Sequence, residues 1–160
     1  MKILKPGSIA LKHFTTGRLG RVVTCEQSPP SFKPNGLWLS VGDAWRDWCV
    51  GEEWNVDGLR RSYDIQLHPD ANILHLSATA DIDAFHDEFH RPPSGLTSGY
   101  FIDWRAVAER HQGIVIAPYV WQRRLHPRTV WYYGWDCASG CIWDAAAVLE
   151  VAETGRGGAI

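Results

Sequence analysis

The sequence predicts a single α+β domain that spans residues 1–160. Short apolar strands alternate with short amphipathic helices, and turns suited to antiparallel neighbours are as frequent as the longer crossovers that parallel strands require. A length of 160 residues is typical of one domain, and no internal repeat, low-complexity tract or linker interrupts it. These observations favour an α+β fold over a regular series of βαβ units.

The composition excludes several classes of protein. Basic and acidic side chains nearly balance, with a net charge of −2, so the chain lacks the footprint of a non-specific nucleic-acid binder. No run approaches the roughly 18 apolar residues of a membrane span, and Pro6 and Gly7 interrupt the apolar N-terminal segment, which is unlike a signal peptide. Four cysteines are too few for a disulfide scaffold of this length. We therefore expect a reduced, cytoplasmic protein with no membrane partner.

In the N-terminal half, apolar periodicity and turn residues delimit four strands and one helix. The expected elements are strands over 9–14, 37–41, 62–67 and 73–77, a loop over 28–36 and a helix that begins at Ala44. Three prolines and an Asn-Gly pair define the loop, and alternation of apolar and polar residues defines the strand over 62–67. Asp43 is expected to cap the helix, which carries Trp45, Trp48 and Cys49 on one face.

In the C-terminal half, helices and strands continue to alternate. The expected elements are a helix from Thr79 or Asp81 to Phe89, an exposed and mobile loop over 91–99, a helix over 104–111, a strand over 113–121, a loop over 123–129, a turn at residues 139–140 and a final core strand over 141–148. Ile82, Phe85 and Phe89 form the apolar stripe of the first helix. Asp103 is expected to cap the second helix, and Gly113 to end it.

Two spacings bear on a metal site. Cys137 and Cys141 are separated by three residues, which lies within the range of a zinc knuckle, but a second pair of ligands is absent from the sequence pattern. His86 and His90 lie four apart on a predicted helix, without the glutamate of the metalloprotease motif. We expect buried inert thiols and a solvated histidine face rather than a metal, and a zinc-stabilised domain is the alternative.

The motifs of covalent catalysis are missing. Ser139 lies in CASGC rather than in a Gly-x-Ser-x-Gly elbow, and no glycine-rich phosphate loop occurs. Cys137 would be a thiolate nucleophile if a histidine approached it in space, and a buried thiol is the simpler interpretation.

Polar side chains also occur inside or beside apolar strands. His13 and Thr15, Ser40, and Asp136 and Asp144 occupy such positions in three separate segments. A polar group that faces a core costs free energy unless it is paired, so residues of this kind often line a cleft. The alternative is that they point to solvent through simple alternation along each strand.

The order of these segments resembles that of the ADP-ribosyltransferase-like family, especially its small bacterial and phage members. HFT (residues 13–15) is similar to the His-x-Thr of a first strand, and GLWLS (36–40) to a Gly-Leu-aromatic-x-Ser/Thr strand that precedes an aromatic-bearing helix. HQGIVIAPY (111–119) is similar to a later Asp-Gly-Ile strand, with Gln112 in place of the aspartate. CIWDAAAV (141–148) resembles the terminal strand, and the layout covers most of the chain.

The resemblance implies a split, mixed and largely antiparallel sheet that binds NAD in a cleft, with no metal. His13 would hydrogen-bond the nicotinamide ribose and Thr15 would support the end of its strand. Trp38 would stack on the nicotinamide, and Ser40 would supply a neighbouring hydroxyl. Aromatic faces and a carboxylate suit the positive charge that develops on the ribose when the bond to nicotinamide breaks.

The sequence departs from the family at the catalytic acid. When Asp144 is aligned on the aspartate of the terminal strand, Ser139 falls at the position of the family's glutamate. Asp136 is the nearest acid, three residues earlier, and Glu150 lies beyond the expected strand. Either Asp136 replaces the glutamate, or the protein keeps the fold and has lost or altered the activity.

The leading hypothesis is therefore a mono-ADP-ribosyltransferase, a transferase of the glycosyltransferase class, that modifies a protein or nucleic-acid target. Asp136 would act at the reacting ribose, and Arg123, Arg124 and Arg128 would dock the target. The alternative is a non-enzymatic interaction or inhibitor protein on the same fold, with exposed tryptophans as anchors. Toxin, defence and phage counter-defence roles all fit, and the sequence does not specify the target, the acceptor residue or the oligomeric state.

Overall fold

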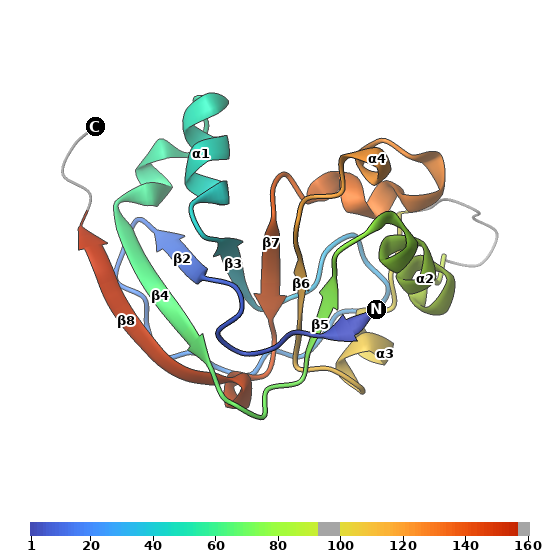
Figure 1. Cartoon of the computed structure of the whole chain (residues 1–160), viewed down its shortest axis with the longest axis horizontal. Helices are drawn as coiled ribbons and strands as arrows, with labels where there is room; N and C mark the ends of the chain where they lie inside the picture. The colour runs from blue at the N-terminus through green and yellow to red at the C-terminus, as the bar shows by residue number, and fades with distance from the viewer. Residues whose placement is uncertain (93–99, 157–160) are drawn as a thin grey trace.

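Eight strands form one mixed sheet in the part of the chain that the computed structural model describes, residues 1–92 and 100–156 (Figure 1). The strand order is β1-β5-β6-β7-β3-β2-β4-β8. Only β5 and β6 pair in parallel, and every other neighbouring pair is antiparallel. The strands are β1 (Lys2–Ile3), β2 (Leu11–Thr15), β3 (Leu37–Val41), β4 (Arg61–Leu67), β5 (Ile73–Leu76), β6 (Gly113–Ile116), β7 (Ser139–Ile142) and β8 (Val148–Arg156). The predicted α+β class is confirmed.

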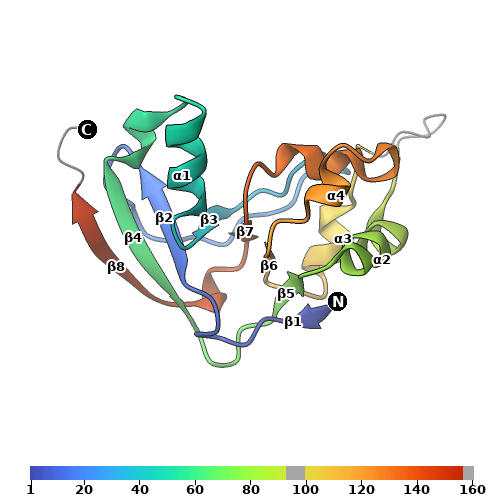
Figure 2. The same cartoon turned by 45° about the horizontal axis from the view of Figure 1, so that its top comes forward.

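The helices are short and lie at the ends and on the faces of this sheet. They are α1 (Ala44–Gly51), α2 (Thr79–Phe89), α3 (Trp104–Ala108) and α4 (Trp121–Arg124), with 3₁₀ segments η1 (Val56–Leu59), η2 (Pro127–Gly134) and η3 (Ala145–Ala147). Figure 2 shows α2, α3 and α4 gathered around β5 and β6, whereas α1 lies beside β2 and β3. None of the helices in the described residues has the length and apolar composition of a membrane span.

One core forms where α2, α3 and η2 cover a face of β5 and β6. Leu74 and Ile114 point into this core, while the neighbouring Ile73 and Val115 point to the opposite face, as strand alternation requires. The two strands are therefore buried on both faces, which explains why they read as continuous apolar runs. The cluster's largest members are aromatic: Phe85, Phe89, Trp104, Trp131, Tyr132, Trp135 and Trp143.

A second core lies on the other face and is built almost entirely from strands. Its buried members include side chains of every strand from β2 to β7, and its one buried residue from a helical segment is Ala147 of η3. Since no long helix of the described residues covers this face, the sheet curves so that β2 and β4 cover the side chains of β5 and β6. Figures 1 and 2 show this curvature as two groups of strands that diverge on either side of β3 and β7.

The two groups of strands meet where β3 pairs with β7. The register places Leu37 opposite Ile142 and Ser40 opposite Ser139. At the start of β3, Gly36 has a φ of +153°, and a Cβ there would lie 2.4 Å from the carbonyl oxygen of Ile142. Only glycine permits that approach, which explains the Asn-Gly pair that precedes the strand.

Several local expectations are confirmed. β3 has the predicted bounds, α2 runs from Thr79 to Phe89 with its predicted stripe buried, and the Asp103 carboxylate accepts a hydrogen bond from the amide of Ala106 at 3.2 Å. α1 begins at Ala44 with Asp43 at its N-cap position, as predicted, but the Asp43 side chain makes no capping hydrogen bond. Its carboxylate pairs with Lys12, and the Ser40 hydroxyl accepts from the amide of Trp45 instead.

The expectations for the C-terminal third need correction. The strand over 113–121 stops at Ile116, just before Pro118, which lacks the amide hydrogen of a ladder residue. The loop over 123–129 instead includes the end of α4 and the start of η2. The helix over 104–111 ends at Ala108.

The final core strand over 141–148 is also wrong, and so is the turn at residues 139–140. Residues 139–142 form β7, and the Asp144 carboxylate then accepts from the amide of Ala146 at 2.9 Å, which starts η3. A further strand, β8, follows and contains Glu150. Most of the expected loop over 91–99 falls on residues 93–99, outside the described residues.

Because Trp104 is fully buried against Phe85 and Trp131, its removal leaves a large cavity in the helix-covered core. We predict that Trp104→Ala lowers the free energy of unfolding by about 3–5 kcal/mol in urea denaturation. Trp121, which is 65% exposed, is the matched control, and Trp121→Ala should change stability by less than about 0.5 kcal/mol. Equal losses in the two variants would contradict this assignment of the core.

Candidate functional site

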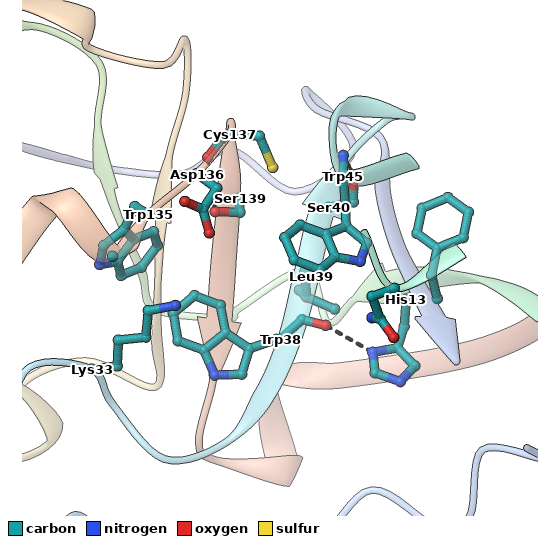
Figure 3. A pocket seen from close by; sticks show the side chains of 13 residues that line it. His13, Lys33, Trp38, Leu39, Ser40, Trp45, Trp135, Asp136, Cys137 and Ser139 are labelled. Atoms are coloured by element: carbon teal, nitrogen blue, oxygen red, sulfur yellow. Dashed lines mark hydrogen bonds between the residues drawn. The ribbon is translucent and has the colours of Figure 1, made fainter. Parts of the chain in front are cut away.

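A pocket of about 310 Å³ opens beside the β3–β7 junction (Figure 3). This volume lies at the lower end of the range for small-molecule sites, about 300–1,000 Å³. Its walls come from β2, β3, β7, the loop before β3, the start of α1 and the end of η2. The lining residues are His13, Phe14, Lys33, Trp38, Leu39, Ser40, Trp45, Asn55, Gly134, Trp135, Asp136, Cys137 and Ser139.

Four of the five residues singled out for catalysis and NAD binding line this pocket: His13, Trp38, Ser40 and Asp136. Trp38 and Ser40 share β3, whereas His13 and Asp136 lie 123 residues apart in the sequence. The sheet brings them together by placing β2 and β7 on either side of β3. Thr15 is not among the lining residues; it ends β2 and pairs with Arg61. Asp144 also lies elsewhere, as the cap of η3.

His13 is held in one orientation by the backbone. Its Nδ1 lies 2.8 Å from the carbonyl oxygen of Trp38 (Figure 3). A carbonyl only accepts, so Nδ1 must carry the hydrogen, and in the neutral ring Nε2 is then an acceptor. The histidine is therefore oriented to accept a hydrogen bond from a ligand hydroxyl.

Indole rings form much of the wall. Trp38 and Trp135 contact each other with ring centroids 4.9 Å apart, and Trp45 lines the pocket from α1 (Figure 3). Lys33 places its ammonium 5.0 Å from the centroid of Trp38. That contact is a cation–π interaction, in which Lys33 occupies the face of Trp38. The indole Nε1 of Trp135 is buried without a hydrogen-bond partner in the described residues.

Asp136 is the only carboxylate that lines the pocket in the described chain, and its side chain is 25% exposed. Its nearest cationic partner is Arg124, whose guanidinium nitrogen lies 3.7 Å from a carboxylate oxygen, longer than a good hydrogen bond. Burial raises the pKa of Asp136, although the charges of Lys33 and Arg124 act in the opposite direction. A partly dehydrated carboxylate without a close partner is a reactive arrangement.

The two serines of the pocket have structural roles. The Ser40 hydroxyl donates to the carbonyl of Gly42 at 2.8 Å and accepts from the amide of Trp45 at 3.0 Å, so it starts α1. Ser139, the residue that the proposed resemblance aligns with a glutamate, donates to the carbonyl of Cys137 at 2.9 Å. Each hydroxyl proton is thus already used within the protein, and neither serine is activated by a neighbouring base.

The cysteines and histidines that suggested a metal are arranged differently. All four cysteines are free, and burial raises the pKa of Cys137 to about 12, so its thiol is neutral at pH 7 and a poor nucleophile. His86 and His90 stack with ring centroids 4.3 Å apart, and burial lowers the pKa of His86 to about 4. In residues 1–92 and 100–156, no group of three or more histidine, cysteine or acidic side chains is positioned to hold a metal ion.

The three arginines expected to dock a target differ in their surroundings. Arg123 forms a two-pronged ion pair with Asp83, at 2.7 and 2.6 Å, and Arg128 pairs with Asp87. Both pairs tie the α4–η2 segment to α2 and neutralise the two charges. Arg124 lies instead between the rings of Trp121 and Tyr133, at 5.7 and 5.5 Å from their centroids.

Sequence reasoning missed several contributors to the pocket, among them Lys33, Trp45, Asn55 and Trp135. Lys33 sits in a proline-rich loop, where the pattern indicates only turns, and Trp135 belongs to a run of aromatics that reads equally well as core. Trp45 was recognised as part of a helix face, but that face was not linked to the strands. Comparisons of the chain with protein-family profiles, curated proteins and solved structures found no match.

The environment of Asp136 leads to a prediction about stability. Its pKa is raised in the folded state, so ionisation at neutral pH disfavours folding, and this cost disappears as the pH falls below the pKa of the unfolded chain. Asp136→Asn should therefore raise the melting temperature at pH 7, measured by differential scanning calorimetry. The gain should shrink in acid. A lower melting temperature at pH 7 would mean that the contact with Arg124 outweighs the desolvation of the carboxylate.

Proposed function

We propose that the protein is an NAD-dependent mono-ADP-ribosyltransferase that transfers ADP-ribose to a macromolecular target. The observation that carries the proposal is the convergence of His13, Trp38 and Asp136 on one pocket, from three separate segments of the chain. These are the residues that the resemblance assigns to ribose binding, nicotinamide stacking and catalysis. Their arrangement suits the chemistry of breaking a nicotinamide–ribose bond.

In that reaction, the C–N bond between ribose C1′ and nicotinamide breaks with both electrons leaving on the nicotinamide nitrogen. Positive charge develops on the ribose, and the partly buried Asp136 carboxylate would stabilise it. The acceptor atom of the target then bonds to C1′ and releases its proton to solvent. Water as acceptor gives NAD hydrolysis.

The remaining pocket residues have compatible roles. The rings of Trp38 and Trp135 offer an apolar surface for the nicotinamide ring, and the acceptor Nε2 of His13 suits a ribose hydroxyl. Lys33 is exposed at the pocket and carries a charge opposite to that of the pyrophosphate. The positive charges of Lys33 and Arg124 both act on Asp136. The Asp136 carboxylate is the only negative group among the described residues that line the pocket.

The direct test incubates the purified protein with labelled NAD, alone and with cell lysate. We expect labelling of a target or release of nicotinamide, and Asp136→Asn should lower the rate by about 100-fold or more, the scale for one electrostatic contact at a reacting centre. Asp70→Asn is the matched control, because the Asp70 side chain is 92% exposed and lies outside the pocket. If the wild type shows no labelling of a target and no release of nicotinamide, the proposal is refuted.

The pH profile provides a second test. Because the reactive form is the carboxylate and burial raises the pKa of Asp136, activity should fall in acid at a higher pH than for an ordinary aspartate. Arg124→Gln removes a charge that lowers this pKa, so the acidic limb should move to still higher pH. An unchanged limb in a folded Arg124→Gln protein would show that Asp136 is not the titrating group.

The exposed aromatic patch at α4 favours a second candidate, a non-enzymatic interaction protein. Trp121, Leu125 and Tyr133 are 65%, 77% and 50% exposed, and Arg124 packs between two of them. Tryptophan, tyrosine and arginine are the residues that most often dominate protein–protein interfaces. If a saturating concentration of NAD leaves the melting temperature of the protein unchanged, this candidate replaces the transferase.

A further inference from the structure

Three tryptophans form a separate aromatic cluster at the edge of the pocket. Trp45 and Trp48 stack with ring centroids 5.1 Å apart and an interplanar angle of 14°. Trp54 meets both rings edge-on, with centroid distances of 5.7 Å. We call Trp45, Trp48 and Trp54 the α1 tryptophan cluster.

This cluster belongs to neither hydrophobic core. Trp45 and Trp48 are half-buried, Trp54 is 53% exposed, and the only buried residue of α1 is Cys49. A tryptophan that serves only the fold gains most when it is fully buried, as Trp104 and Trp131 are. Three contacting indoles that remain accessible leave apolar surface for another planar group to cover.

The α1 tryptophan cluster is continuous with the pocket. Trp45 lines the pocket while contacting Trp48 and Trp54, and Asn55, the residue after Trp54, also lines it. Figure 3 shows Trp45 next to Ser40, across the pocket from Trp135. A ligand that binds between Trp38 and Asp136 and extends past Trp45 would therefore reach the α1 tryptophan cluster.

Asn55 adds a polar group at the same place. Its backbone is left-handed, with a φ of 50°, a conformation that asparagine tolerates better than most residues. Its side-chain amide makes no hydrogen bond to any described residue, whereas its carbonyl accepts from the amide of Gly58. An amide offers both a donor and an acceptor, which suits the edge of a nucleobase.

We propose that the α1 tryptophan cluster is a stacking subsite for a second planar base, with Asn55 beside the edge of that base. The inference rests on the proposed function, in which the Trp38–Asp136 end holds the nicotinamide. The ligand of the whole site is then a dinucleotide, and adenine occupies the subsite. A mononucleotide would use only one end.

The test measures the dissociation constants of NAD, AMP and nicotinamide mononucleotide by isothermal titration calorimetry. Trp54→Ala should weaken binding of AMP and NAD by about 5- to 150-fold, the range for losing one base–aromatic stack. The dissociation constant of nicotinamide mononucleotide should be the same for Trp54→Ala as for the wild type. Trp54→Phe should recover part of the affinity for AMP.

Trp121→Ala is the matched control, since Trp121 is also more than half exposed but lies on α4 and makes its ring contact with Tyr119 rather than with the α1 tryptophan cluster. It should leave all three dissociation constants unchanged. Circular dichroism spectra are used to check that each variant is folded. Wild-type affinity of Trp54→Ala for AMP and NAD would overturn the subsite and leave the transferase proposal standing.

The converse result is equally clear. AMP binding that depends on Trp54, in a protein that neither turns over NAD nor labels a target, would refute the transferase and support the subsite. If the wild type binds neither AMP nor NAD, the subsite and the transferase proposals are both overturned.

Discussion

The pairing of β3 with β7 is the contact on which the rest of the structure depends. It joins the strands covered by α2, α3 and η2 to the strands β2, β4 and β8. The contact is tight, because Gly36 approaches the carbonyl of Ile142 more closely than any side chain would allow. The same register sets Ser40 opposite Ser139. Asp136 lies three residues before Ser139, so this pairing brings it to the pocket that Trp38 also lines.

Polar groups near this junction are satisfied unequally. Ser40 and Ser139 use their hydroxyl protons on nearby carbonyls and thereby shape the backbone. By contrast, Asp136 has only a long contact with Arg124, and Trp135 Nε1 is buried without a partner in the described chain. Uncompensated polar groups cost stability, and a ligand that hydrogen-bonds Asp136 or Trp135 would recover part of that cost. In the described chain, unpartnered buried side-chain atoms also occur outside the pocket, on His86, Tyr119, Arg124 and Trp131.

The abundance of tryptophan has three separate explanations. Trp104, Trp131 and Trp143 fill the helix-covered core, where large rings span the distance between short helices and a sheet. Trp38 and Trp135 contact this core and also form the pocket wall. The remaining tryptophans, Trp45, Trp48, Trp54 and Trp121, are partly or largely exposed, and this division separates the fold from the surfaces available for recognition.

The sequence by itself determined the fold class, the bounds of β3 and α2, and the cap at Asp103, because periodicity and capping depend on residues a few positions apart. His13 and Asp136 stood out as polar residues inside or beside apolar strands, and the family resemblance singled out Trp38. Only the tertiary structure decided that they share a pocket, that Arg123 and Arg128 are neutralised by α2, and that Asp144 caps a turn. It likewise decided where the last strands lie. CIWDAAAV is apolar enough for one strand, but β7 ends at Ile142, and the hydrogen bond from the Ala146 amide to the Asp144 carboxylate starts η3 instead. Pairing, burial and pKa depend on groups tens of residues apart, and no local pattern encodes those distances.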